Sequence, residues 1–385
     1  MAGASGWHVQ ATIWVVGGYA RQLWVILASC ITTILAPTFE FGNSNLLPIS
    51  IDNLINLRHL DVAGAIKLQE MPIRIDKLKD LRILSNFIVD KNKGLTIKEL
   101  KDVSHLRGEL CISKLENVVN IQDARDADLK LKRNLESLIM QWSSELDGSG
   151  NERNQMDVLD SLQRCLNLNK LCIQLYGGPK FPRWIGDALF SKMVDLSLID
   201  CRKCTSLPCL GQLPSLKQLR IQGMVGVKKV GAEFYGETRV SAGLKRLPDG
   251  MMLKMRNGST DNNLCLLECL RIWKCPSLIC FPKGQLPTTL KKLTIRDCQN
   301  LKSLPEGMMH CNSIATTSTM DMLPITLKAL YISDCEKLES LPEGIMHYDS
   351  TYAAALQSLA ICHCSSLTSF PRDKKAHPSY TARDL

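Results

Sequence analysis

The sequence predicts an α/β solenoid, a fold in which short strands from successive repeats form one parallel sheet. One observation is a close internal repetition: residues 290–309 read LKKLTIRDCQNLKSLPEGMM, and LKALYISDCEKLESLPEGIM begins thirty-seven residues further on. A second observation is that leucines, one isoleucine and one cysteine occupy the same places in both copies, whereas the residues between them vary. Repetition at this scale is typical of stacked units, each too small to fold alone.

The same pattern of apolar residues occurs at other points of the chain. Besides the copies at Leu290 and Leu327, it begins at Leu57, Met193, Leu216, Leu267 and Leu356. Neighbouring copies start 23 residues apart in two cases and then 37 and 29 residues apart, so the unit is about 23 residues long with insertions. This length and the order L-x-x-L-x-L-x-x-N/C-x-L are the signature of leucine-rich repeats.

Each repeat is expected to begin with a short strand. Leu293 and Ile295 are two residues apart, so their side chains lie on the same side of an extended chain. The apolar spacing then becomes three, through Cys298, Leu301 and Leu304. A proline follows in several copies, and proline lacks the backbone donor that regular pairing needs. The strand therefore stays a few residues long before the chain turns back.

A single repeat cannot be stable by itself. It buries about half a dozen apolar side chains at roughly 1.5–3 kcal/mol each, whereas ordering its backbone costs roughly 1–2 kcal/mol for every residue fixed. Stacking covers each apolar wedge with its neighbours and pairs each strand with the next. We therefore expect a curved solenoid with a parallel sheet on its concave face and short helices and irregular loops on its convex face.

Three parts follow along the chain: an apolar leader at residues 1–45 whose origin the sequence leaves open, a leucine-rich-repeat domain at 46–371, and a polar tail at 372–385. The leader contains an uncharged apolar run of 14 residues, 23–36. A membrane span needs about 20 residues, and a signal peptide has positive charge before its apolar stretch. A non-standard signal, a weak membrane anchor and a segment unrelated to the repeats all stay open.

Within the repeat domain, another copy begins at Leu78, and two further strands are predicted at residues 110–112 and 138–140. The charged stretch at 122–133 between these two strands has the composition of a helix. Residues 145–155 are polar and contain glycine, which indicates an exposed loop.

A convex-side helix is predicted at residues 156–166. Its apolar residues are spaced to share one helical face, and Asp157 stands near the expected start, where a helix favours negative charge. The residues of that face are Val158, Leu159, Leu162 and Leu166. Two later segments, 236–263 and 310–322, contain glycine, serine, threonine and asparagine and are predicted to be long loops.

The chain has 16 cysteines, and five of them fall at one position of the repeat: Cys201, Cys275, Cys298, Cys335 and Cys364. This regularity favours a small buried residue whose thiol donates to the backbone where the chain leaves the strand. The CxxC at Cys201 and Cys204 has no second ligand pair at zinc-finger spacing, so no metal site is predicted. Disulfides between neighbouring repeats are within reach on distance grounds and would need an oxidising compartment.

Charge and composition argue against nucleic acid as a ligand. The formal net charge is +9, aromatic residues make up 5%, and no long run of lysine or arginine occurs. Basic residues do gather at expected concave positions: Lys217, Arg220, Arg271, Lys291, Lys292, Arg296 and Lys328. Solvated charge explains them, and a patch that selects acidic partners is the alternative.

Enzymatic motifs are absent from the sequence. It contains no G-x-S-x-G or H-E-x-x-H motif. Asp297 and Asp334 recur at equivalent repeat positions, which favours a role in loop hydrogen bonding over acid–base chemistry. The sequence therefore predicts neither an enzyme nor a cofactor.

Several blocks of the sequence carry a family resemblance. They are LPISIDNLINLRHLDV, GELCISKLENV with DARDADLKLKRNLESLIMQW, MDVLDSLQRCLNLNKLCIQLYGGPKFPRWIGD and CRKCTSLPCLGQLPSLKQLRIQGM. Over residues 46–371 the chain resembles the repeat region of plant intracellular nucleotide-binding leucine-rich-repeat disease resistance proteins of the coiled-coil class. The resemblance implies a sensor that faces pathogen effectors or guarded host proteins and holds a nucleotide switch off. The sequence has no GxxxxGK[ST] loop and no MHD-type motif, so nucleotide binding does not carry over.

The leading functional prediction is a protein-recognition module of plant defence that binds an effector or host protein through its concave face. The expected contacts are Arg220, Gln222, Arg271, Trp273, Thr294, Arg296, Tyr331 and Ser333. Trp273 is the expected anchor, as an exposed aromatic between basic neighbours. Covering the sheet edge is its alternative role.

A cytoplasmic location is expected, because the chain has one glycosylation sequon, at Asn257, and S-L-P where secreted plant repeats carry G-x-I-P. Two alternatives stay open. One is a membrane-tethered or secreted protein of receptor or inhibitor type, with residues 23–36 as the tether. The other is a truncated resistance-gene product without active signalling.

Overall fold

The computed structural model describes residues 12–17, 39–41, 54–62, 68, 70–71, 75–90, 95–143, 152–162, 165–230, 266–281, 289–304, 327–341 and 356–368. The chain forms two compact units, residues 1–177 and 178–385. The predicted loops at 236–263 and 310–322, the apolar run at 23–36 and the polar tail lie outside the described residues. Among the residues that are described, no helix is both long enough and apolar enough to cross a membrane.

The first unit contains a small parallel sheet with the strand order β2-β1-β3-β4. Its strands are β1 (Thr12–Gly17), β2 (Phe39–Phe41), β3 (His59–Asp61) and β4 (Ile83–Leu84). Strands β1 and β2 belong to the segment that the sequence set apart as a leader. β1 nevertheless pairs with β3, with Thr12 opposite His59.

Four further parallel strands follow in the first unit: β5 (Asn86–Ile88), β6 (Arg107–Ser113), β7 (Asn134–Gln141) and β8 (Lys170–Gln174). The strands predicted at 110–112 and 138–140 are therefore confirmed within β6 and β7. Leu110, Leu138 and Leu171 occupy equivalent positions in register, and each is at most 1% exposed. The core of this unit is thus built from in-register apolar rows.

Short helices cover the other side of the repeats in the first unit. They are η2 (Ile75–Lys77), η3 (Ile97–Asp102), η4 (Leu115–Asn117), α2 (Ile121–Asp126), η5 (Leu129–Leu131) and α3 (Glu152–Ser161). Helix α2 begins after Asn120, whose side chain accepts a hydrogen bond of 3.0 Å from the backbone N–H of Gln122. The helical prediction for 122–133 is confirmed in part by α2 and η5, because Asp128 between them adopts a left-handed conformation that interrupts the helix.

Helix α3 corrects the prediction for residues 145–166. It begins at Glu152, so residues 152–155 are helical and Asp157 lies inside the helix instead of at its start. Val158, Leu159 and Leu162 are buried as predicted. Leu166 is 41% exposed, because the helix ends at Ser161 and the periodic face does not reach it.

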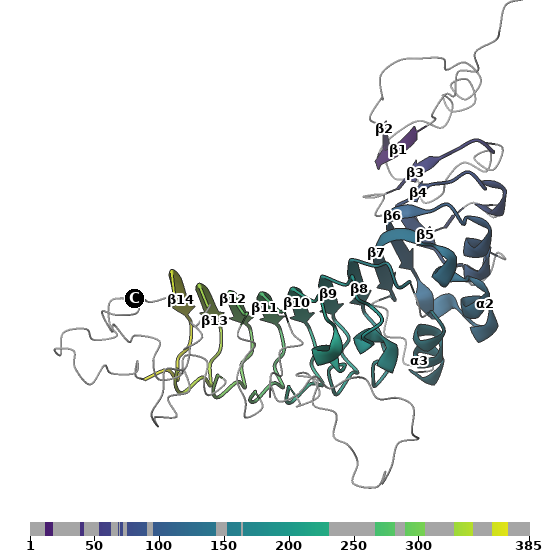
Figure 1. Cartoon of the computed structure of the whole chain (residues 1–385). Helices are drawn as coiled ribbons and strands as arrows, with labels where there is room; N and C mark the ends of the chain where they lie inside the picture. The colour runs from purple at the N-terminus through teal and green to yellow at the C-terminus, as the bar shows by residue number, and fades with distance from the viewer. Residues whose placement is uncertain are drawn as a thin grey trace, which may run out of the picture. The chain divides into compact units, whose positions relative to one another are not determined.

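The second unit carries six parallel strands that lie side by side in one row (Figure 1): β9 (Asp195–Ile199), β10 (Gln218–Gln222), β11 (Cys269–Trp273), β12 (Lys292–Arg296), β13 (Ala329–Ser333) and β14 (Ser358–Cys362). Each strand pairs with the next in a continuous one-to-one register. Two short helices, η6 (Arg183–Gly186) and η7 (Leu210–Gln212), precede β9 and β10. The α/β leucine-rich-repeat solenoid is confirmed.

The second and fourth residues of these strands form the core of the second unit. The second residues of β9 to β13 are Leu196, Leu219, Leu270, Leu293 and Leu330, all at most 2% exposed. In β14 the equivalent Leu359 is half-buried, although the sequence pattern predicted it to point inward like the others. β14 is the last strand of the row and pairs with β13 alone among the described strands, so the described part of the chain covers its apolar residues from one side.

A repeated turn ends each strand. One residue after the strand adopts a left-handed conformation with φ between +52° and +67°: Asp200, Gly223, Lys274, Asp297, Asp334 and His363. In the first five of these turns the N–H of this residue donates to the last carbonyl of the next strand, at 2.7 Å from Asp200 to Gln222 and 3.1 Å from Asp334 to Cys362. The recurrent cysteine comes next.

The structural role predicted for that cysteine is confirmed. Cys201, Cys275, Cys298 and Cys335 are at most 2% exposed, and each thiol donates to the carbonyl two residues earlier at 3.3–3.5 Å. The thiol thus provides a donor for a carbonyl at the point where the chain leaves the sheet.

Candidate functional site

The side of the β9–β14 sheet opposite the core carries the first, third and fifth residues of each strand, because side chains alternate along a strand. We call these residues the strand face. The first row is Asp195, Gln218, Cys269, Lys292, Ala329 and Ser358; the third is Ser197, Arg220, Arg271, Thr294, Tyr331 and Ala360; the fifth is Ile199, Gln222, Trp273, Arg296, Ser333 and Cys362.

All eight residues predicted to contact a partner lie in the third and fifth rows of β10 to β13. The structure therefore brings them together from a stretch of more than 110 residues of sequence, Arg220 to Ser333. Neighbouring strands are about 4.8 Å apart, so the eight residues span roughly 15 Å across the sheet.

Trp273 is held by a neighbouring strand. The Arg220 guanidinium carbon lies 5.1 Å from the centroid of the Trp273 ring. One guanidinium nitrogen of Arg220 also donates a 3.0 Å hydrogen bond to Gln222 Oε1. Since the arginine covers part of the ring, Trp273 is half-buried instead of exposed, which corrects the prediction.

Two donors in this cluster have no partner among the described residues. They are Trp273 Nε1 and Arg220 Nε, and both atoms are buried. A cation–π contact of this kind contributes about 0.5–2 kcal/mol. The stacked pair is thus a fixed apolar and cationic surface whose two unpaired donors are covered by neighbouring atoms.

A second aromatic cluster lies on β12, β13 and β14. Lys292 Nζ is 5.0 Å from the centroid of the Tyr331 ring. The Tyr331 hydroxyl and Ser358 Oγ form a hydrogen bond of 2.9 Å. Both aromatic rings of the predicted site therefore carry a basic side chain over one face.

Part of the positive charge on and beside the strand face is neutralised. Glu268, one residue before β11, lies 2.9 Å from Lys291 and 3.7 Å from Lys217, and the hydrogen bond from Lys291 holds the pKa of Glu268 below its ordinary value. Arg296 Nε is 3.8 Å from Asp297 and 3.6 Å from Asp334. These carboxylates, which the sequence assigned to loop hydrogen bonding, lie beside the arginine at the edge of the strand face.

Four basic residues in the same area pair with no carboxylate of the described part of the chain: Arg220, Arg271, Lys292 and Lys328. Arg220 and Lys292 lie over aromatic rings, and Lys328 stands directly before β13. The centre of the strand face is therefore a surface of uncompensated positive charge around two aromatic rings.

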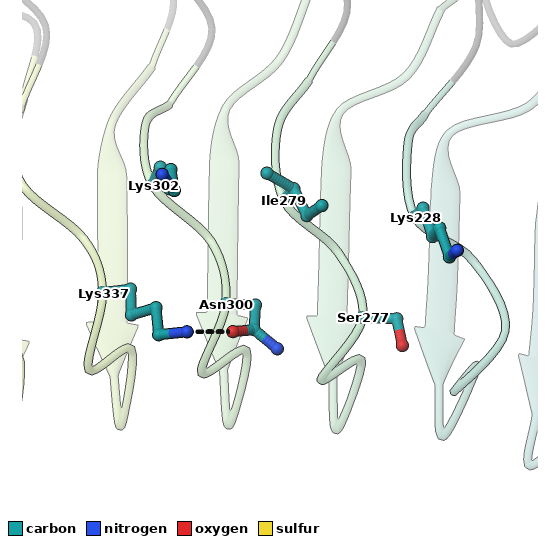
Figure 2. Close-up of a pocket in the computed structure, with 6 residues that line it drawn as sticks. All are labelled: Lys228, Ser277, Ile279, Asn300, Lys302 and Lys337. Carbon is teal, nitrogen blue, oxygen red and sulfur yellow. Dashed lines mark hydrogen bonds between the residues drawn. The ribbon is translucent and has the colours of Figure 1, made fainter.

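A shallow pocket of about 350 Å³ lies on the segments that follow the strands (Figure 2), and the sequence analysis did not foresee it. It is lined by Lys228, Ser277, Ile279, Asn300, Lys302 and Lys337. Lys337 Nζ donates a 2.7 Å hydrogen bond to Asn300 Oδ1. These residues stand three or five places after the left-handed turn residue of their repeats, a spacing that could have identified them as neighbours.

The continuous register, the buried apolar rows and the repeated turn place the chain in the class of leucine-rich-repeat proteins. Residues 97–224 match the family described as R13L1/DRL21 leucine-rich repeats. Residues 241–373 match the family described as plant disease resistance protein RPS2-like, leucine-rich repeats. These two stretches of the chain are therefore similar to the leucine-rich repeats of plant disease resistance proteins.

Curated relatives agree. A protein described as disease resistance RPP13-like protein 1 of Arabidopsis thaliana is 34% identical over 228 residues, which are 56% of this chain and 20% of the relative. Disease resistance protein RGA2 of Solanum bulbocastanum is 29% identical over 260 residues, 59% of this chain and 27% of the relative. Across the relatives matched, the aligned part spans between 16% and 34% of their length.

Solved structures with a similar fold are more distant in sequence. The leucine-rich repeat domain of the type III effector XopL is 16% identical, with a TM-score of 0.37 over 71% of this chain and 66% of that domain. A leucine-rich repeat protein of Leptospira interrogans is 17% identical, with a TM-score of 0.38 over 84% of this chain and 88% of that protein.

Proposed function

We propose that this chain is a protein-recognition module of plant defence, and that it binds a pathogen effector or a host protein through the strand face of β10 to β13. The observation that carries the proposal is the alignment of Arg220, Arg271, Trp273 and Tyr331 in two neighbouring rows of one sheet. Tryptophan, tyrosine and arginine are the residue types enriched at binding hot spots.

The dimensions of the site favour a macromolecular partner. The eight residues cover roughly 15 Å across the strands, and their two rows are about 7 Å apart along a strand. Stable protein interfaces bury about 800 Å² on each partner, several times this patch. The eight residues are therefore suited to be the centre of an interface whose rim includes neighbouring strands and turns.

The charge of the site favours an acidic surface on the partner. Arg220, Arg271, Lys292 and Lys328 have no carboxylate partner among the described residues, so an incoming carboxylate would not have to displace one. Complementary charge chiefly raises the association rate and selects among partners. The association rate therefore distinguishes an acid-selective site from the alternative, a basic face that is only solvated.

The test begins with a binary interaction screen of the full chain against cloned effectors and host proteins, followed by calorimetry on each interacting pair. We expect the triple variant R271A/W273A/R296A to weaken binding at least about 100-fold, since hot-spot truncations each cost about 2 kcal/mol or more. The matched control is K228A/K302A/K337A, which changes the same number of residues away from the strand face. It should keep the affinity within about threefold.

Two results would contradict the proposal. One is an unchanged affinity in R271A/W273A/R296A with an unchanged circular-dichroism melt. The other is an equal loss in K228A/K302A/K337A. The single variant R271E leaves both aromatic rings in place, so a slower association with a normal melt would separate lost binding from lost folding.

A cytoplasmic location with reduced thiols is part of the proposal, supported by the similarity to plant disease resistance proteins. Thiol counting on protein isolated from plant cells under acid trapping tests it. Oxidised thiols together with a glycan at Asn257 would favour the secreted or membrane-tethered alternative instead.

A further inference from the structure

Two cysteines occupy equivalent positions in the turns that follow β13 and β14, the last two described strands of the second unit. Ser333 at the end of β13 is in register with Cys362 at the end of β14, and Cys335 and Cys364 each follow two residues later. The N–H of Asp334 donates to the carbonyl of Cys362 at 3.1 Å, so the register continues into the turn.

This spacing is close to that of a disulfide. Equivalent residues on neighbouring strands lie about 4.8 Å apart, and bridged cysteines have Cα atoms about 4.4–6.8 Å apart. Bridged Cβ atoms are closer, at about 3.5–4.5 Å, so the pair needs a shift of a few tenths of an ångström. A turn position at the end of the strand row can move by that amount more easily than a residue inside the sheet.

Both thiols bond to the backbone of their own turns. The Sγ of Cys335 donates to the carbonyl of Ser333, and that of Cys364 to the carbonyl of Cys362, both at 3.4 Å. The neighbouring Cys335 thiol lowers the pKa of Cys364 to about 7, and the same neighbour relation raises the pKa of Cys335.

The charged groups around the pair act on the Cys364 thiolate in opposite directions. His363 lowers the pKa of Cys364 and Asp334 raises it. Asp334 is itself 3.3 Å from His363 Nδ1 and 3.6 Å from Arg296 Nε, so its charge is partly offset. The neighbouring Cys335 thiol remains the largest influence on the pKa of Cys364.

Solvent access to the thiols distinguishes Cys335 and Cys364 from a second pair of cysteines at the same repeat position. Cys275 and Cys298 follow β11 and β12 at the same repeat position, and each thiol likewise donates to the carbonyl two residues earlier. They are 2% and 0% exposed, whereas Cys364 is half-buried beside a buried Cys335. Thiol oxidation needs both thiolate character and access, and only the β13–β14 pair combines them among these four cysteines.

We propose that Cys364 and Cys335 form an oxidation site for hydrogen peroxide, with Cys364 as the attacking thiol and Cys335 as the resolving thiol. The Cys364 thiolate attacks one peroxide oxygen, the O–O bond breaks, and hydroxide leaves and takes up a proton as water. Cys364 is then a sulfenic acid. The Cys335 sulfur displaces its hydroxyl group, which leaves as a second water, and an S–S bond forms. Two thiols and one peroxide give one disulfide and two waters.

The bond would tie the last described strand to its neighbour. Leu359 of β14 is half-buried, so this repeat is covered less completely than the repeats before it. A covalent link between the two turns would hold β14 against β13 across the sequence insertion at 342–355. The consequence is an oxidant-dependent increase in the order of this end of the second unit.

The test treats the reduced full chain with hydrogen peroxide at pH 7, blocks free thiols by alkylation under denaturing conditions, and maps the tryptic peptides. We expect peptides 329–337 and 338–372 to be joined through Cys335 and Cys364, with a loss of about 2 Da for the two hydrogens removed. Cys275 and Cys298 should stay reduced as the matched control. Cys364 should react about tenfold faster than an ordinary exposed thiol, because about half of it is ionised at pH 7.

Single substitutions distinguish the attacking thiol from the resolving thiol. In C364S the link should be lost and Cys335 should stay reduced, whereas in C335S the sulfenic acid on Cys364 should persist and be trapped by dimedone. C362S removes the neighbouring exposed cysteine and should leave the link intact. Thermal melts of the reduced variants check that they fold. The peptide mapping of the unsubstituted chain does not depend on any variant.

Any of three outcomes within one molecule would overturn the proposal. These are a Cys362–Cys364 bond in place of the predicted link, oxidation of Cys364 to a sulfinic acid with Cys335 still free, and equal oxidation of Cys275 and Cys298. A link found only between separate molecules would also contradict it.

Discussion

At the residue scale, Lys132 is a charged side chain buried in the first unit. It is 2% exposed, and its Nζ donates to the backbone carbonyls of Leu100 and Val103. These carbonyls lie at the end of helix η3, where a helix leaves acceptors without internal partners. Burial nevertheless lowers the pKa of Lys132 from 10.5 to about 8. The lysine satisfies two acceptors at the cost of desolvating its charge.

This lowered pKa makes stability depend on pH. Between pH 8 and 10.5 the folded chain releases the Lys132 proton while the unfolded chain keeps it, so this group makes the free energy of unfolding rise with pH. From pH 7 to pH 9 the gain should be about 1 kcal/mol. We expect the difference in unfolding free energy between the unsubstituted chain and K132M to rise by that amount in urea titrations. A difference that is flat or falls with pH would show that the lysine is hydrated in the folded state.

Gly223 is the one glycine among the six left-handed turn residues of the second unit. Its φ is +67°, and a Cβ atom added there would lie 2.1 Å from Asp200 Oδ1. The equivalent Lys274 adopts φ of +52° with a side chain present. The turn therefore tolerates a Cβ in general, and Asp200 is what excludes one at Gly223.

We expect G223A to lower the free energy of unfolding by about 1–2 kcal/mol, through the contact with Asp200 and the left-handed backbone. K274G relieves the same backbone strain but makes the unfolded chain more flexible, so its effect should stay below about 0.5 kcal/mol. Chemical denaturation of both variants measures this. Equal effects would mean that the turn conformation alone decides stability. The double variant D200A/G223A should recover part of the loss.

At the element scale, neighbouring residues of one strand lie on opposite sides of the sheet. In β12, Leu293 is 0% exposed in the core, while Thr294 points to the strand face. We expect L293A to cost about 2–5 kcal/mol of unfolding free energy, the usual range for a buried leucine. T294A should cost less than about 0.5 kcal/mol, although it changes a predicted contact residue. A large loss of stability in T294A, or a small one in L293A, would invert the assignment of faces.

The strands could be predicted from the sequence because their signal is local. Two apolar residues that stand two places apart, such as Leu293 and Ile295, recur in every copy, and this spacing alone decides which side chains enter the core. The turn cysteines were equally predictable, since Cys298 and Cys335 recur at one place. The eight residues of the predicted site share rows for the same reason: their register follows from the repeat.

Other features depend on contacts that the pattern does not contain. Helix α3 begins at Glu152, inside a polar stretch that reads as a loop, and its end at Ser161 leaves Leu166 outside the apolar face. Trp273 is half-buried because Arg220 on the neighbouring strand stacks on it. Leu359 has the core pattern but stands on the last strand of the row. In each case contacts with neighbouring residues decide where the helix ends or how far the side chain is buried.

At the scale of the whole molecule, stability in each unit should come from contacts between successive repeats. Every strand from β9 to β14 pairs with the strands next to it in the row. In such an architecture the stability is close to a sum of repeat terms and nearest-neighbour terms. A change at one end of the row should therefore affect the adjacent strand and leave distant strands almost untouched.

Deleting residues 356–385 tests this, because it removes β14 and uncovers one edge of β13. The hydrogen bonds from Gln357 to Lys328 and from Asp334 to Cys362 are lost with it. We expect amide hydrogen exchange in β13, residues 329–333, to become about 10- to 100-fold faster, since local opening would cost roughly 1–3 kcal/mol less. Exchange in β9, residues 195–199, should change less than about twofold. The matched control deletes residues 369–385 alone, keeps all six strands and should leave both rates unchanged. If β9 and β13 lose protection equally, the second unit opens as one cooperative body, and the additive picture of its repeats is wrong.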